Sequence, residues 1–218
     1  MKYRLACFDL DGTLLDTLGG LTSSLNAARR MNNLAPQTEE QVKTFINNGV
    51  VKFIERSLAA DPGEYSEELK IKLLKDNVSY YNSHYLENTH PYNGIVEAVT
   101  RLKSDGMLLA CVSNKNDEPA RKLIDHFFPD LFDYVSGAVE GVEKKPSYEP
   151  VERCLNSLGV DNSEAVYIGD TDTDILTAKN SRMHCISCAW GYKTRDFLNE
   201  NGADTICSAP MDLRSLIM

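Results

Sequence analysis

Two carboxylates stand two residues apart in the segment Phe8-Asp9-Leu10-Asp11-Gly12-Thr13, directly after the apolar residues Leu5-Ala6-Cys7. The apolar run predicts a short buried strand, and Gly12 allows a sharp turn where that strand ends. One carboxylate at such a strand end can attack an electrophile or bind a metal ion, and the second can transfer a proton. An Asp-Gly pair after an apolar run is also typical of an ordinary turn. The functional interpretation of this segment therefore depends on the other segments of the chain that carry similar residues.

Three later segments also carry chemically active residues at or near an expected strand end. Val112-Ser113-Asn114-Lys115 follows an apolar run, Lys144-Lys145-Pro146 precedes a helical pattern, and Ile168-Gly169-Asp170-Thr171-Asp172-Thr173-Asp174 follows another apolar run. The order along the chain is therefore an acid pair, a hydroxyl, a lysine and a second acid pair. Open α/β folds keep their active sites at the carboxyl ends of strands, so we expect these side chains to meet at one edge of a sheet.

The elements that must position these segments change in type along the chain. From residue 16 to residue 87, apolar residues recur at helical spacing and predict an all-helical insert. Beyond it, strand-like and helical runs alternate, which predicts a parallel sheet covered by helices on both faces. The predicted organisation is a discontinuous α/β core of residues 1–15 and 88–218, with the helical insert 16–87 over its strand ends as a lid.

Composition disfavours several classes of function. The chain has 218 residues and a formal net charge of −9, so broad nucleic-acid binding is not expected. No apolar run approaches the roughly 20 residues that span a bilayer, and the N-terminus shows no secretory pattern. We therefore expect a cytoplasmic protein that binds neither nucleic acid nor membrane. Cys185-Ile186-Ser187-Cys188 has no second metal-binding pair beside it, so the six cysteines are interpreted mostly as small buried side chains.

In these four segments and in their order, the chain resembles the haloacid dehalogenase superfamily of aspartate-nucleophile phosphotransferases. Asp11-Gly12-Thr13-Leu14-Leu15-Asp16-Thr17, Asn47-Asn48-Gly49 and Pro91-Tyr92-Asn93-Gly94 resemble its phosphoglycolate phosphatase subgroup. The resemblance spans nearly the whole chain and implies a Rossmann-like core with a helical cap domain inserted after the first motif. It implies phosphoryl transfer rather than dehalogenation, because members that break carbon–halogen bonds lack an acid at the position of Asp11.

The resemblance also implies roles for single residues. Asp9 would be the nucleophile that forms an aspartyl-phosphate, while Asp11 would protonate the leaving alcohol and then deprotonate the attacking water. The residues expected to bind or position the phosphate are Thr13, Ser113, Asn114 and Lys145. The expected cofactor is Mg²⁺, which prefers oxygen ligands, and its ligands would be Asp9, the backbone carbonyl of Asp11, and Asp170, with Asp174 orienting them from outside.

In the predicted cap, specificity is expected from Asn47, Asn48, Gly49 and Arg56. The first three precede a helix that begins near Val50, so their backbone amides could face an anion. Arg56 follows one or two turns later and could reach a substrate carboxylate. A solvated charge on the helix surface is the more common interpretation of such an arginine.

The predicted function is Mg²⁺-dependent hydrolysis of a small phosphorylated metabolite, with phosphoglycolate as the leading substrate, by a monomer or homodimer. Three alternatives stay open. A phosphomutase similar to β-phosphoglucomutase carries similar motifs and differs in its cap contacts. A pyrophosphatase or nucleotidase of the same superfamily is equally compatible. A non-catalytic binding protein on the same fold is disfavoured, because a binding module needs no general acid such as Asp11.

Overall fold

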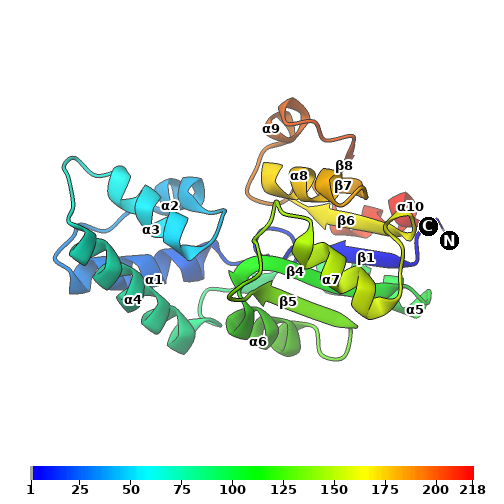
Figure 1. Cartoon of the computed structure of the whole chain (residues 1–218), viewed down its shortest axis with the longest axis horizontal. Helices are drawn as coiled ribbons and strands as arrows, with labels where there is room; N and C mark the ends of the chain where they lie inside the picture. The colour runs from blue at the N-terminus through cyan, green and yellow to red at the C-terminus, as the bar shows by residue number, and fades with distance from the viewer. Residues whose placement is uncertain (1) are drawn as a thin grey trace. The chain divides into compact units, whose positions relative to one another are not determined.

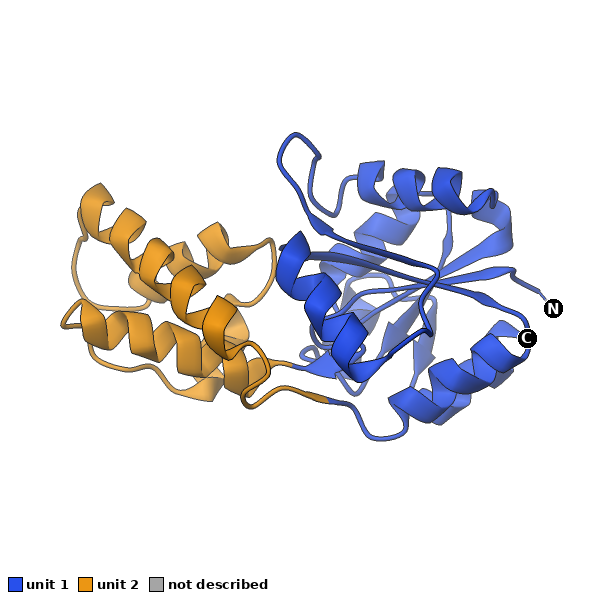
Figure 2. Ribbon diagram, turned by 90° about the horizontal axis from the view of Figure 1, so that it is seen from below, with its two compact units in different colours: residues 1–16, 91–218 blue, residues 17–90 orange. Residues whose placement is uncertain are grey.

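The structure is a computed structural model that describes residues 2–218, and its helices and strands are labelled in Figure 1. The chain divides into two compact units (Figure 2). Unit 1 comprises residues 1–16 and 91–218, and unit 2 comprises residues 17–90. Two short strands, β2 (Leu15–Asp16) and β3 (His90–Pro91), pair with each other in a small sheet of their own.

Unit 1 is built from strands and helices that alternate along the chain. Its main strands are β1 (Leu5–Phe8), β4 (Leu108–Asn116), β5 (Tyr134–Ala138), β6 (Ala165–Gly169), β7 (His184–Cys188) and β8 (Thr205–Cys207). Its helices are α5 (Ile95–Ser104), α6 (Asp117–Phe127), α7 (Glu149–Leu158), α8 (Asp172–Asn180), α9 (Arg195–Glu200) and α10 (Leu213–Ile217), with 3₁₀ turns η1 (Asn162–Glu164) and η2 (Pro210–Asp212).

The six main strands of unit 1 form one parallel sheet in the order β5-β4-β1-β6-β7-β8 (Figure 1). All four residues of β1 are completely buried, as expected for a strand with both faces covered. The predicted α/β class with a Rossmann-like parallel sheet is confirmed. β4 and β6 flank β1 on opposite sides, so the strand order reverses here, where open α/β sheets bind their ligands.

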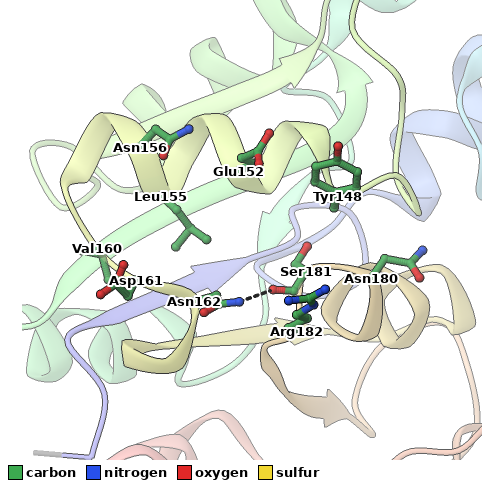
Figure 3. Close-up of a pocket in the computed structure, with 10 residues that line it drawn as sticks. All are labelled: Tyr148, Glu152, Leu155, Asn156, Val160, Asp161, Asn162, Asn180, Ser181 and Arg182. Carbon is green, nitrogen blue, oxygen red and sulfur yellow. Dashed lines mark hydrogen bonds between the residues drawn. The ribbon is translucent and has the colours of Figure 1, made fainter.

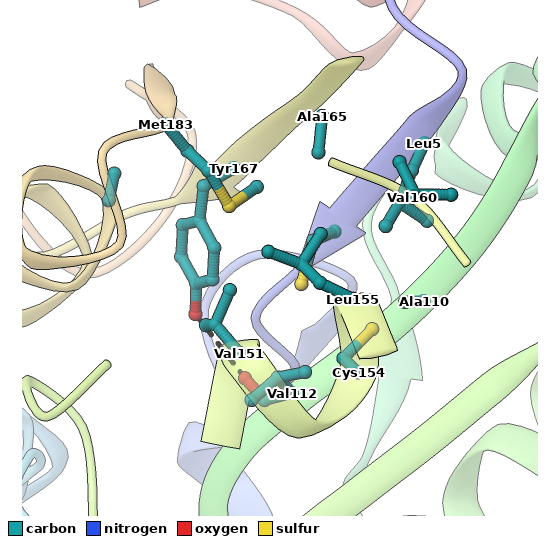
Figure 4. Close-up of a cluster of buried hydrophobic side chains, with 12 residues drawn as sticks. Leu5, Ala110, Val112, Val151, Cys154, Leu155, Val160, Ala165, Tyr167 and Met183 are labelled. Carbon is teal, nitrogen blue, oxygen red and sulfur yellow. Dashed lines mark hydrogen bonds between the residues drawn. The ribbon is translucent and has the colours of Figure 1, made fainter. Parts of the chain in front are cut away.

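One face of the sheet packs against α7 through a cluster of buried side chains (Figure 4). Val151, Cys154 and Leu155 recur at helical spacing and form the apolar stripe of this helix. They pack with Leu5 of β1 and Tyr167 of β6, among others. Burial of a large aliphatic side chain stabilises a fold by roughly 1.5–3 kcal/mol, so this cluster fixes the strands from which the site residues emerge.

The structure corrects the expected start of α8. The sequence pattern predicts a helix over 175–180, whereas the helix begins at Asp172. Thr171 and Asp174 form a capping box, in which the Asp174 carboxylate accepts hydrogen bonds from the backbone and the hydroxyl of Thr171. This cap satisfies donors at the helix start, so the helix begins early. The edge strand β8 was not predicted.

Unit 2 is helical and has a core of its own. Its helices are α1 (Leu18–Met31), α2 (Glu39–Phe45), α3 (Val50–Ala59) and α4 (Glu67–His84). All four contribute to one apolar cluster, whose buried members are Leu25, Ala28, Val42, Phe45, Phe53, Ile54, Leu58 and Leu73. Across residues 2–218, none of the helices combines the length and the apolarity that crossing a membrane requires.

A buried arginine organises the polar interior of unit 2. The side chain of Arg29 is 1% exposed, and its Nη2 donates to both carboxylate oxygens of Asp61 at 3.0 and 2.8 Å. Its Nε donates to the carbonyl of Ala35 at 2.6 Å, and its Nη1 donates to Ser57 Oγ at 3.0 Å. A buried charge is costly unless it is paired and hydrogen-bonded, and this network meets both conditions while it ties α1 to α3.

Candidate active site

Asp170 is held in a tight pocket directly after β6. Its side chain is completely buried, and its Oδ1 accepts a hydrogen bond from Thr13 Oγ1 at 3.0 Å. Its Oδ2 accepts one from the backbone N–H of Tyr192 at 2.8 Å. A Cβ atom added to Gly12 would lie 2.4 Å from that Oδ2, and one added to Gly191 would lie 2.5 Å from it. Only glycine therefore fits at these two positions.

The ammonium group of Lys145 lies among three oxygen atoms. Its Nζ is 2.9 Å from Asp9 Oδ1 and 3.0 Å from Asp174 Oδ1. It also donates to Tyr167 Oη at 2.8 Å. The contacts to Tyr167 and Asp174 are hydrogen bonds, whereas Asp9 Oδ1 accepts no hydrogen bond within the described residues and is held by the ion pair alone. Burial lowers the pKa of Lys145, but the charges of Asp174 and Asp9 outweigh it and the pKa is raised.

Asp174 uses both of its carboxylate oxygens on protein donors. Its Oδ1 faces Lys145, while its Oδ2 accepts from the hydroxyl of Thr171 at 2.6 Å and from the backbone N–H of Thr171 at 3.1 Å. A Cβ atom on Gly169 would lie 2.3 Å from the Asp174 carboxyl carbon, so this glycine allows the close approach. Asp174 is thus placed to brace Lys145 rather than to approach a ligand directly.

Three buried carboxylates gather in this part of unit 1. Asp9, Asp170 and Asp174 each offer an oxygen, and these oxygens lie within 4.8 Å of one another. Burial raises the pKa of Asp170 well above its ordinary value, and the charges of Asp174 and Asp9 add to this effect. Burial also raises the pKa of Asp9, to about 6, against the lowering effect of Lys145.

The charge balance of this cluster fits a divalent cation. Three carboxylates against the one ammonium of Lys145 leave two negative charges uncompensated. The available donors are carboxylate oxygens, which suit hard cations such as Mg²⁺ rather than thiophilic metals. The residues present therefore fit a hard divalent metal ion beside Asp9 and Asp170.

Asp11 forms an ion pair with Lys115, a lysine for which the sequence predicted no role. Lys115 Nζ donates to both carboxylate oxygens of Asp11, at 2.9 and 3.1 Å. The side chains are 7% exposed for Lys115 and 17% exposed for Asp11. The partners are 104 positions apart in the chain, so no local pattern announces the pair. One signal in the sequence could have indicated that Lys115 belongs to the site. Lys115 follows Ser113 by two residues on the same strand, and alternate residues of a strand share a face.

Ser113 and Asn114 extend the site from β4. Ser113 is buried, and its Oγ accepts the backbone N–H of Lys115 at 3.2 Å, which leaves its own hydroxyl proton as a donor. The side chain of Asn114 donates to the carbonyl of Lys145 at 2.9 Å and accepts from the Lys145 N–H at 2.8 Å. Asn114 therefore holds the backbone that presents Lys145, a contact that sequence analysis did not foresee.

The predicted cap residues belong to unit 2 and form a compact loop there. Asn47, Asn48 and Gly49 all have positive φ, at 120°, 64° and 87°. Arg56 donates to the carbonyls of Phe45 and Asn47 at 2.9 and 3.0 Å, and to Asn48 Oδ1 at 2.6 Å. The interpretation of Arg56 as a solvated helix charge is therefore wrong, because its guanidinium secures this loop.

A cavity of about 410 Å³ lies elsewhere in unit 1, along α7 and the end of α8 (Figure 3). The Asn162 side chain donates to the carbonyl of Ser181 at 3.3 Å across one side of it. None of the predicted site residues lines this cavity, whose lining is Tyr148, Glu152, Leu155, Asn156, Val160, Asp161, Asn162, Asn180, Ser181 and Arg182. The acid cluster is thus a separate feature of the molecule.

Comparison with known proteins adds independent information. Residues 6–188 match the family described as haloacid dehalogenase-like hydrolase. A phosphoglycolate phosphatase from Aquifex aeolicus is 34% identical over 219 residues, which cover 98% of this chain and 96% of that protein. One from Neisseria meningitidis is 31% identical and covers 92% and 86%. The crystal structure of a candidate phosphoglycolate phosphatase from Lactobacillus delbrueckii subsp. bulgaricus superposes with a TM-score of 0.95 at 34% identity, covering 100% of this chain and 99% of that one.

Proposed function

Since the chain belongs to the haloacid dehalogenase-like hydrolase family and is a phosphoric monoester hydrolase, we propose that it hydrolyses phosphoglycolate through an aspartyl-phosphate on Asp9. The observation that carries the mechanism is the Lys145 ammonium, fixed 2.9 Å from Asp9 Oδ1 beside two further buried carboxylates. The identity to two phosphoglycolate phosphatases supports the choice of substrate.

In the proposed first step, Asp9 attacks the phosphorus of the ester. Lys145 holds Oδ1 and favours the ionised carboxylate, which leaves Oδ2 to attack in line with the ester oxygen. The bond from Oδ2 to phosphorus forms while the ester P–O bond breaks. Asp11, which takes up a proton from solvent when it leaves its ion pair with Lys115, gives that proton to the departing alcohol oxygen. Ser113 donates a hydrogen bond to a phosphoryl oxygen.

In the proposed second step, water cleaves the aspartyl-phosphate. Asp11 removes a proton from the attacking water, the water oxygen bonds to phosphorus, and the bond between phosphorus and Asp9 Oδ2 breaks. Inorganic phosphate leaves and the Asp9 carboxylate is restored. Both steps need Asp11 to turn from its fork with Lys115 toward the reacting oxygen.

We propose that Asp9, the backbone carbonyl of Asp11, and Asp170 hold Mg²⁺. When bound, the cation supplies positive charge that offsets the charge of the phosphoryl oxygens. Thr13 fixes the orientation of Asp170 through its hydroxyl hydrogen bond, and Asp174 braces Lys145 from the other side. The expected cytoplasmic location and the expected monomer or homodimer stay predictions.

We propose that unit 2 is the specificity cap. Its bounds are 17–90, where the sequence pattern placed the insert at 16–87. Backbone amides of Asn47-Asn48-Gly49 would meet an anionic group of the substrate. Arg56 would act through the shape of this loop, because its guanidinium is engaged by the loop's own carbonyls.

Phosphate release from a panel of esters tests the proposed function. The panel contains phosphoglycolate, sugar phosphates, nucleotides and pyrophosphate, each with Mg²⁺ and again with EDTA. We expect metal-dependent release that strongly favours phosphoglycolate. Preference for nucleotides or pyrophosphate would replace the substrate assignment, and interconversion of sugar-phosphate isomers without release would identify a phosphomutase. Absence of any reaction would overturn the proposal.

Mg²⁺ is expected to raise the melting temperature of the wild-type protein by about 5 °C at saturating concentration, because a ligand that binds only the folded state stabilises it. Asp170→Asn should abolish this rise, since it removes one of the clustered charges that the cation offsets. Asp172→Asn, a neighbouring substitution outside the cluster, should keep it. Differential scanning calorimetry with and without Mg²⁺ measures both. An undiminished rise in Asp170→Asn would show that the cation binds elsewhere.

A further inference from the structure

Lys115 brings a second buried ammonium to the acids of the site. Its Nζ lies 2.9 and 3.1 Å from the two oxygens of Asp11, and its side chain is only 7% exposed. It lies near the end of β4, two residues beyond Ser113, which donates to the phosphoryl group in the proposed mechanism. This lysine therefore stands beside both the phosphate-binding hydroxyl and the proposed proton donor.

The two lysines of the site differ in how firmly their partners hold them. Lys145 donates hydrogen bonds to Asp174 and Tyr167 and is ion-paired with Asp9, so a substrate group can bind this ammonium only if one of these three side chains moves away. The partner of Lys115 behaves differently in the proposed mechanism, since Asp11 must turn toward the ester oxygen. A buried ammonium that loses its carboxylate is strongly destabilised. When Asp11 turns away, the site therefore favours a substrate with a second anionic group that can bind the Lys115 ammonium.

We propose that Lys115 binds the carboxylate of the substrate and so selects phosphate esters of 2-hydroxy carboxylic acids over neutral esters. In such an ester one carbon atom separates the ester oxygen from the carboxylate carbon. Asp11 contacts that ester oxygen during proton transfer, so a cation within hydrogen-bond distance of Asp11 lies within reach of the neighbouring carboxylate. This inference rests on the proposed function and gives a residue of unit 1 a part in the choice of substrate, in addition to the loop proposed in unit 2.

The loop of unit 2 offers a weaker alternative for the same task. Arg56 was one candidate for reaching a substrate carboxylate, but its guanidinium already donates to Phe45, Asn47 and Asn48. Releasing it would leave those carbonyls without their donor. Lys115 exchanges one carboxylate for another, which conserves both charge and hydrogen bonds.

The test compares two esters that differ only in this carboxylate. They are 2-phosphoglycolate and 2-hydroxyethyl phosphate, in which a CH₂OH group replaces it. The wild type should favour phosphoglycolate. Lys115→Met should lower kcat/KM for phosphoglycolate roughly 10- to 100-fold more than for 2-hydroxyethyl phosphate, with the extra loss mainly in KM, as expected when a charge-assisted hydrogen bond is lost. Lys115→Arg should retain most of the preference.

A matched control is Lys103→Met, which removes a lysine of unit 1 that pairs with Asp133 at 2.6 Å near the surface. It should leave both kcat/KM values unchanged. An equal loss for both esters in Lys115→Met would show that Lys115 acts only by holding Asp11, and would overturn the inference. If Lys115→Met fails to fold, the preference of the wild type and of Lys115→Arg decides instead, and equal use of both esters overturns it. A wild type that releases phosphate from neither ester overturns the proposed function itself.

Discussion

Asp9→Asn is expected to lower phosphate release by about 10⁴-fold or more, as seen when a catalytic nucleophile is removed, while the chain stays folded. The amide keeps the shape of the side chain, and its oxygen can still face the Lys145 ammonium. It lacks the charged oxygen that attacks phosphorus in the proposed mechanism. Burial raises the pKa of Asp9 to about 6, and the negative charges of Asp174 and Asp11 add to this effect. A neutral side chain at this position therefore reduces charge repulsion among the carboxylates, and the fold should tolerate it.

Three measurements separate loss of the nucleophile from loss of structure. Circular dichroism of Asp9→Asn should match the wild type, and Asp172→Asn should hydrolyse phosphoglycolate at close to the wild-type rate. After acid quench during turnover, the wild-type peptide that contains Asp9 should carry the mass of a phosphoryl group, and the variant peptide should not. Turnover of Asp9→Asn near the wild-type rate would exclude Asp9 as the nucleophile.

Arg29→Ala is expected to lower the free energy of unfolding of unit 2 by about 3–5 kcal/mol, the cost of breaking a buried ion pair by removing one partner. The variant leaves the Asp61 carboxylate, 17% exposed, without its cation and frees the carbonyl of Ala35 and the hydroxyl of Ser57 from their donor. Urea denaturation followed by far-ultraviolet circular dichroism measures the change.

The neighbouring residue provides the control for this prediction. Arg30 is exposed on the same helix, and Arg30→Ala should change the free energy of unfolding by no more than about 0.5 kcal/mol. Trp190 is the only tryptophan of the chain and lies in unit 1, where its Nε1 donates to the carbonyl of Thr13 at 3.0 Å. Its fluorescence therefore follows unit 1 separately. Equal stability of the Arg29 and Arg30 variants would show that the buried network contributes little.

The positions of Asp9 and Asp170 could be predicted because each follows an apolar run that is too short for a helix, with a glycine nearby. Asp9 and Asp170 leave β1 and β6, which are hydrogen-bonded neighbours in the sheet. Their side chains meet because parallel neighbours end at the same edge. The sequence thus indicates which residues converge, while their catalytic roles stay predictions.

The partners of the charged residues could not be predicted in the same way. Lys115 meets Asp11 across 104 positions and Arg29 meets Asp61 across 32, and such pairs depend on how the helices and strands pack. One missed feature did have a local signal. Thr171 followed by Asp174 has the spacing of a capping box, which marks a helix start. Placing the start of the helix at Ile175 overlooked it.

Insertion of unit 2 behind the first strand sets the order in which the ribosome can complete the sheet. β1 emerges first, but its neighbours β4 and β6 are both translated after residues 17–90. Unit 2 is continuous in sequence and can fold while β1 still lacks both partners. During that interval the nascent strand has two open edges, the state most prone to wrong pairing. Because β1 is only four residues long, few unpaired backbone groups are available for pairing with another chain during this interval.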